Sequence, residues 1–136
     1  MDIIIGLGHS GYTKDKEIAG KVPHLDLVIG AHSHSFLYPK EENQPSLEHP
    51  KGPYPTMVVG KGGRKVPVVQ AYAYTKYLGK LILDIDQEGE VTSIDGRPVL
   101  LDSKFKQSKK KGFIFFKKDC SCSLGLQRYS GSLTHF

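Results

Sequence analysis

Two apolar runs that each end on glycine and then histidine constrain the fold of this chain more than any other feature. The first is "IIIGLGH", residues 3–9, and the second is "LDLVIGAH", residues 25–32. Aliphatic and β-branched runs of this length that stop at glycine are typical of short buried strands. We therefore expect a strand in each run, with its histidine in the loop that follows.

The segment between the two runs predicts a helix, which makes the unit β-α-β. Thr13 can cap the helix, Asp15 lies in the first turn where the helix dipole favours carboxylates, and Ile18 and Val22 share one face. Pro23 prevents the helix from continuing. A β-α-β unit pairs its strands in parallel. Both histidine loops are thus expected at the carboxyl edge of one sheet, where open α/β folds bind their ligands.

The second half of the chain predicts mostly antiparallel strands. Residues 39–55 hold five prolines and three glutamates and predict an irregular surface loop. "PTMVVG" and "KVPVVQAYAY" predict a hairpin around the glycine turn "KGGRK", and "YLGKLILDID" turns through "QEGE" into "VTSI". We therefore expect a sheet-rich α/β fold with one main helix up to about residue 102.

Several other polar residues have both a structural and a functional interpretation. Gln70 is expected to satisfy backbone groups near the histidine loops instead of reacting. Lys76 and Tyr77 could form a phosphate-binding pair, but we expect a structural corner before a strand. "GKGGRK" lacks the spacing of a phosphate loop, and Ser10 and Ser33 lack an acidic partner for nucleophilic catalysis.

The basic charge of the chain lies in its last residues. Residues 1–103 hold 11 Lys and Arg against 13 Asp and Glu, whereas residues 104–136 hold 8 against 1. Three accounts of this tail stay open: a disordered basic extension, a terminus foreign to the fold such as an alternative exon or read-through, and a patch for nucleic acid or anionic membrane. We expect a disordered basic C-terminal tail over residues 103–136, without specific nucleic-acid binding.

Neither a transmembrane segment nor a signal peptide is predicted in this chain. Its apolar runs are far shorter than the roughly 20 residues that a membrane-spanning helix needs, and no basic region precedes the first of them. Cys120 and Cys122 are too few for a disulfide framework, and a single C-x-C is a weak metal or redox signal.

His9, His32 and His34 are the candidate metal ligands. Small neighbours in "GLGHSG" and "GAHSHS" leave room for a compact ligand beside these side chains. Imidazole binds divalent transition metals, and three imidazoles converging from neighbouring strand ends suit one or two such ions. From the spacing alone, ordinary hydrogen-bonded loop histidines remain an alternative. The other histidines, which are His24, His49 and His135, are expected on the surface.

The paired histidine motifs carry a resemblance to a known family. The chain is similar to the 5'-nucleotidases, including the related apyrases of blood-feeding arthropods, over "GLGHSGYTKDKEIAGKVPHLDLVIGAHSHSFLY" and "GRKVPVVQAYAYTKYLGKLILDID". The resemblance implies that residues 1–102 are the C-terminal half of a calcineurin-like metallophosphoesterase domain, part of a four-layer α/β/β/α sandwich. It also implies that His9 and His32 bind one divalent ion, often zinc, and that His34 binds a second. Two such ions grip phosphate oxygens and activate water for hydrolysis of a nucleoside monophosphate.

The same resemblance implies residues that this sequence does not contain. The family draws its bridging carboxylate and its catalytic histidine from the motifs D-x-H, G-D-x-x-D and G-N-H-D/E, none of which occurs in the 136 residues. Imidazoles without that carboxylate should hold two cations poorly, and no general acid remains. We therefore expect a 5'-nucleotidase fragment that is inactive by itself, with no catalytic residue assigned. In the intact family the activity serves nucleotide catabolism outside the cell or at its surface.

Half of such a sandwich would also have incompletely covered surfaces. It would expose an apolar face and unpaired strand edges, which favours aggregation unless a partner, such as a second copy in a homodimer, covers them. Two other functions stay open. One is a non-catalytic fragment that binds a metal or a partner, and the other is binding of nucleic acid or anionic lipid through the tail.

Overall fold

The computed structural model of the chain describes residues 3–40, 42–87 and 89–105. The chain divides into two units, Met1–Phe105 and Lys106–Phe136. All of the described residues belong to the first unit. Most of the predicted basic tail, with its cysteines and His135, lies outside the described residues. No helix in the described part is long and apolar enough to cross a bilayer.

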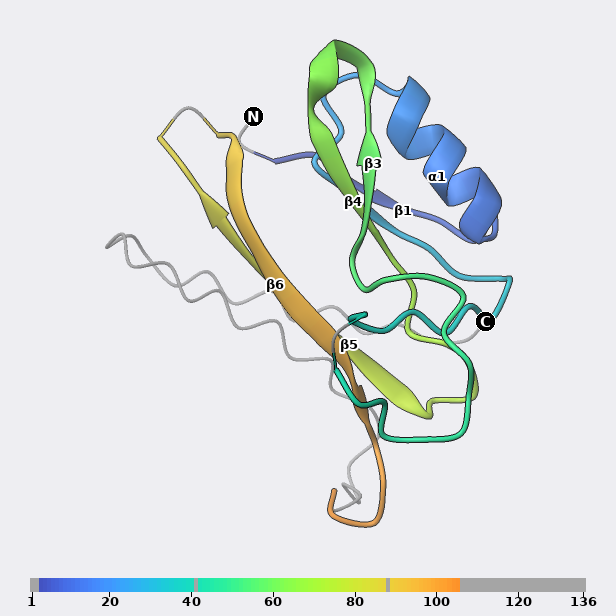
Figure 1. Cartoon of the computed structure of the whole chain (residues 1–136). Helices are drawn as coiled ribbons and strands as arrows, with labels where there is room; N and C mark the ends of the chain where they lie inside the picture. The colour runs from blue at the N-terminus through green and yellow to red at the C-terminus, as the bar shows by residue number, and fades with distance from the viewer. Residues whose placement is uncertain (1–2, 41, 88, 106–136) are drawn as a thin grey trace, which may run out of the picture. The chain divides into compact units, whose positions relative to one another are not determined.

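The described part of the chain consists of one α-helix and six strands (Figure 1). The helix α1 spans Tyr12–Lys21. The strands are β1 (Ile5–Leu7), β2 (Leu27–Ile29), β3 (Thr56–Val59), β4 (Lys65–Val69), β5 (Tyr77–Ile85) and β6 (Val91–Leu100), and a 3-10 turn, Lys61–Gly63, joins β3 to β4. The predicted sheet-rich α/β composition with one main helix is confirmed.

The strands form a four-stranded and a two-stranded sheet. The larger has the order β1-β2-β4-β3, in which β1 and β2 pair in parallel with Ile5 opposite Leu27. The predicted β-α-β unit is therefore present. β4 continues the parallel set beside β2 and pairs antiparallel with β3, which confirms the predicted hairpin. β5 and β6 pair antiparallel as the second sheet.

The two faces of the larger sheet are covered by different elements (Figure 1). Neighbouring residues on a strand point to opposite faces, so Val28 and Leu27 of β2 enter different apolar clusters. The cluster on the α1 side contains Ala19, Leu25, Val28, Val66 and Val68. The cluster on the other side contains Leu27, Leu37, Tyr54 and Val69, with Leu81 and Leu83 of β5 packed against it. Helix, sheet and second sheet are three successive layers of the expected α/β/β/α sandwich.

The first strand differs from its prediction in position and in burial. The apolar run over residues 3–5 predicts a buried strand, but β1 spans Ile5–Leu7. Just before it, Ile4 O accepts from Asp26 N–H at 2.9 Å, and Ile4 N–H donates to the Asp26 carboxylate at 2.8 Å. Ile5 is 52% exposed and Leu7 is 81% exposed, because β1 is an edge strand of the sheet.

The start of α1 also differs from its prediction. Thr13 lies within the helix, and Gly11, which has no side chain, occupies the N-cap position. The Oγ of Ser33 caps the helix from a distant loop, because it accepts a hydrogen bond from the Tyr12 N–H at 2.9 Å. Asp15 lies in the first turn, as predicted, but its side chain is buried. The helix ends before Pro23, which also agrees with the prediction.

Residues 39–55 are irregular, as predicted, but they are not all at the surface. Tyr54 belongs to the core and is only 4% exposed. The segment is fastened to the start of β5 by an ion pair between Glu48 and Lys76 and by hydrogen bonds from Ser46 to Glu48 and between Ser46 and Tyr77. These contacts are those of the structural corner that we expect at Lys76 and Tyr77.

This fastening makes stability depend on pH in the acid range. The hydrogen bond from Lys76, with a second from Ser46, lowers the pKa of Glu48 from 4.5 to about 2. A carboxyl with a lowered pKa in the folded state stabilises it above its unfolded pKa, and this contribution is lost as pH falls from about 4.5 towards 2. Glu48→Gln is therefore expected to flatten the fall of the thermal midpoint over that range.

Glu42→Gln is the matched control for this pH series. Glu42 pairs with Arg97 at 2.8 Å, but their side chains are 42% and 60% exposed, so water screens the pair. An equal flattening in both variants would contradict the assignment to Glu48.

Candidate functional site

The loops that carry the predicted ligands leave the carboxyl edge of the parallel strands. His9 follows β1 by two residues, and His32 follows β2 by three. Two backbone hydrogen bonds extend the ladder to the first loop residues, from Gly8 N–H to Ile29 O at 3.0 Å and from Gly30 N–H to Val69 O at 2.9 Å. The loops after β1, β2 and β4 therefore begin side by side.

The structure brings two of the three predicted ligands together. The ring centroids of His9 and His32 are 5.2 Å apart with an angle of 66° between the planes, and both residues are exposed. Metal–imidazole bonds are about 2.0–2.1 Å long, so rings at this spacing are close enough to share one ion. His34 is also exposed, but its ring packs edge-on against Tyr74 at 5.3 Å. The described residues contain no cluster of three or more His, Cys, Asp or Glu side chains placed to hold a metal.

Non-glycine residues in left-handed backbone conformations gather at this edge. His32 has φ 72° and His34 has φ 47°. Such conformations cost about 1–3 kcal/mol each and persist only where the surroundings enforce them, commonly at functional sites. The loop after β4 has the same property, at Tyr72, Tyr74 and Thr75. Nothing in the letters "HSHS" or "YAYT" indicates this strain, so the sequence could not have predicted it.

Gln70, the residue after β4, is buried beneath the loop of residues 31–35, which carries His32 and His34, and forms hydrogen bonds to it. Its side chain is 2% exposed, its Oε1 accepts from Ser35 N–H at 3.0 Å, and its Nε2 donates to Ala31 O at 2.8 Å. The backbone of the two loops also pairs directly, from Tyr72 N–H to Ser35 O at 3.2 Å. The prediction that Gln70 satisfies backbone groups near the histidines is confirmed.

The loops of His9 and His32 are also in direct contact. A Cβ at Gly11 would lie 3.7 Å from Cδ2 of His32 and 3.7 Å from Cβ of Ser33, so the two chain segments touch at this glycine. From the sequence, Ser33 was weighed only as a possible nucleophile. In the structure it links the two segments by capping α1. Its place between two histidines is the one signal that could have marked it as part of the site.

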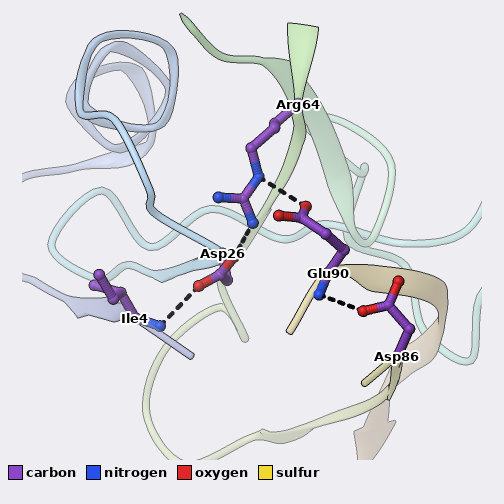
Figure 2. Close-up of polar contacts among 5 residues, drawn as sticks. All are labelled: Ile4, Asp26, Arg64, Asp86 and Glu90. Atoms are coloured by element: carbon purple, nitrogen blue, oxygen red, sulfur yellow. Dashed lines mark hydrogen bonds and ion pairs between the residues drawn. The ribbon is translucent and has the colours of Figure 1, made fainter. Parts of the chain in front are cut away.

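A second polar cluster lies at the opposite end of β2 and has a different character (Figure 2). Asp26 accepts from Ile4 N–H and pairs with Arg64, whose Nε also reaches Oε2 of Glu90 at 3.1 Å. Glu90 N–H donates to Asp86 Oδ1 at 2.8 Å. A cleft of about 610 Å³ runs beside this cluster. Arg64 pairs with both Asp26 and Glu90, so the cluster ties the larger sheet to the turn between β5 and β6.

Known proteins with similar sequences are 5'-nucleotidases and apyrases. An apyrase of Aedes albopictus is 48% identical over 113 residues, which are 81% of this chain and 20% of the apyrase. A 5'-nucleotidase of Homo sapiens is 53% identical over 104 residues, which are 76% of this chain and 18% of the enzyme. The chain thus spans about one fifth of the length of these relatives. No family model matches the chain.

Solved structures give the same picture. A 5'-nucleotidase precursor from Thermus thermophilus aligns with a TM-score of 0.64 at 32% identity, over 74% of this chain and 19% of that chain. The NAD nucleotidase of Haemophilus influenzae aligns with a TM-score of 0.61 at 26% identity, over 82% of this chain and 21% of that chain. Fold and sequence therefore agree on the same group of proteins.

Proposed function

Because this chain belongs to the 5'-nucleotidase and apyrase family, as a segment of about one fifth of its relatives' length, we propose that it forms part of a centre that hydrolyses nucleoside 5'-phosphates. The observation that carries the proposal is the pair of exposed rings of His9 and His32, 5.2 Å apart at the carboxyl edge of parallel strands. The proposed substrate class, nucleoside 5'-phosphates, is inferred from the relatives, which are 5'-nucleotidases and apyrases. We also propose that the protein acts outside the cell or at its surface.

In this proposal His9 and His32 hold one divalent ion and His34 holds a second. Exposed imidazoles at strand ends are suitable ligands for zinc, the metal that we expect. Divalent ions at this edge would supply positive charge to the phosphate oxygens of the ester. The chain itself contributes the ring nitrogens. The left-handed backbone at His32 and His34 sets the direction of these two side chains.

We further propose that the chain by itself does not turn over substrate. The motifs D-x-H, G-D-x-x-D and G-N-H-D/E, which supply the shared carboxylate in the family, do not occur in its sequence. The carboxyl of Asp15 cannot replace them, because it is buried against Gln70. Without compensating negative charge a second cation binds poorly.

Zinc titration of the full chain by calorimetry tests the proposed ligands. His9→Ala and His32→Ala are each expected to weaken zinc binding by about tenfold or more, because each removes one of two donors. His24→Ala is the matched control, since His24 is an exposed histidine with φ 63°, close to the φ of 72° at His32. Equal effects from all three substitutions would remove the argument for a site.

A phosphate-release assay with adenosine monophosphate and added zinc tests the proposed inactivity. No release above the blank is expected from the isolated chain. Release that is abolished by His32→Ala would show that the chain is active alone, and the account of its missing carboxylates would be wrong. A chain without zinc binding at the histidines would instead favour the alternative of a fragment that binds a protein partner.

A further inference from the structure

Gln70 uses every hydrogen-bonding position of its side chain. The Nε2 group has two N–H donors, which go to Ala31 O at 2.8 Å and to Asp15 Oδ2 at 2.9 Å. Oε1 accepts from Ser35 N–H at 3.0 Å and from the Ser33 hydroxyl at 3.2 Å. The amide is therefore held on all sides by α1 and by the histidine loop.

Asp15 and the Ala31 carbonyl, which both accept from Nε2, together determine the orientation of this amide. A carboxyl oxygen without a proton can only accept, so it requires Nε2 on its side and leaves Oε1 facing Ser35 N–H. A flipped amide would bring its oxygen against the Asp15 oxygen and its N–H groups against the Ser35 N–H. The loop then could not bond to Gln70.

The bonds from Gln70 fall on alternate residues of the loop. Ala31, Ser33 and Ser35 are the residues that it holds. His32 and His34, which lie between them in the sequence, are both exposed and both have left-handed φ. Hydrogen bonds to every second residue hold the loop in place and leave the imidazoles of His32 and His34 exposed.

Asp15 is costly to bury in this place. It is 1% exposed, and its Oδ1 has no hydrogen-bond partner among the described residues. The absence of a side chain at Gly30 leaves space for the Asp15 carboxyl, because a Cβ at this position would overlap it. A buried acceptor without a partner needs a compensating role, and no core-packing role requires a carboxyl at this position.

We infer that Asp15 is a positioning residue, which acts with the Ala31 carbonyl to hold the amide of Gln70 so that the Ala31–Ser35 loop presents His32 and His34. The inference relies on the proposed function only for what the histidines bind. The geometry of the loop can be measured without any metal.

Amide hydrogen exchange and ring NOEs, measured by NMR on the full chain without metal, test this role. Asp15→Leu is expected to speed exchange of the Ser35 amide by about tenfold or more relative to the amides of β2 and to weaken the NOE between the His9 and His32 rings. Asp15→Asn keeps an oxygen acceptor for Nε2, so it should preserve both signals. Rescue by Asn distinguishes positioning from simple loss of core packing.

Asp26→Leu is the matched control. Asp26 is a buried carboxylate at the other end of β2, so its loss is expected to lower stability without singling out Ser35. If Asp15→Leu does not fold, Gln70→Met applies the same test, because it keeps the volume and removes the four hydrogen bonds. Equal acceleration of Ser35 and of the β2 amides in both Asp15→Leu and Gln70→Met, or failure of Asp15→Asn to rescue, would overturn the inference.

The outcome is separable from that of the proposed function. If Asp15→Leu loosens the loop while His32→Ala leaves zinc binding unchanged, the positioning role stands and the proposed function fails. If His32→Ala weakens zinc binding while the Ser35 amide of Asp15→Leu exchanges as in the parent, the proposed function stands and the positioning role fails.

Discussion

Gly30→Ala is expected to lower the free energy of unfolding by about 3 kcal/mol or more, because it adds a methyl group where none fits. The new Cβ would overlap the carboxyl of Asp15 and lie 3.1 Å from Nε2 of Gln70. Relief requires Asp15 to leave its buried position, which breaks its hydrogen bond with Gln70. Denaturant unfolding followed by circular dichroism measures the loss.

Gly20→Ala is the control for this substitution. Gly20 lies in the last turn of α1, and a Cβ there would have its nearest neighbour, Val58 Cγ1, at an ordinary 3.7 Å. Alanine is a better helix former than glycine by about 0.8–1 kcal/mol, so a gain in stability is expected. Similar unfolding curves for Gly30→Ala and the parent chain would contradict the packing described around Asp15.

We expect the chain to self-associate through the edge strand β1, and the double variant Ile5→Lys, Leu7→Lys to weaken this association by about a hundredfold or more. Ile5 and Leu7 lie on the edge strand β1 and are 52% and 81% exposed, so a second copy can cover their side chains and pair with the open edge. Burying two such side chains is worth about 3 kcal/mol or more, which corresponds to about a hundredfold in affinity. Sedimentation velocity over a concentration series measures the change.

Leu47→Lys is the control for the edge strand. Leu47 is 94% exposed, more than either β1 residue, but it lies in the irregular segment and offers no strand edge. It is therefore expected to leave self-association unchanged. A parent chain that stays monomeric at all concentrations would contradict the prediction for β1.

Much of the fold could be predicted because its signals are local. The β-branched runs, the glycines that end them and Pro23 mark strand, loop and helix end within a few residues of one another. Parallel pairing of β1 with β2 then follows from the helix between them. The prediction that β1 is buried was wrong because its signal is not local. The exposure of an edge strand depends on which elements lie beside it and not on its own sequence.

The site could be predicted only in part, for the same reason. The closeness of His9 and His32 could be predicted because each lies within three residues of the end of a strand, and the role of Gln70 because it directly follows one. Asp15 is 55 positions from its partner Gln70, and Ser33 is 21 positions from the Tyr12 N–H that it caps, and no local pattern indicates such contacts. Asp15 has an ordinary place in the first turn of a helix, so only the structure shows that it is buried.

The cap that Ser33 gives to α1 has a consequence for how the chain folds. The helix is ten residues long, and helices shorter than about 12–15 residues are marginal in water by themselves. Its first turn lacks a capping side chain of its own and obtains one only when the loop beyond β2 has docked. We therefore expect α1 to gain its order together with the β1–β2 pair in one cooperative step, and a peptide of residues 11–22 to remain a random coil.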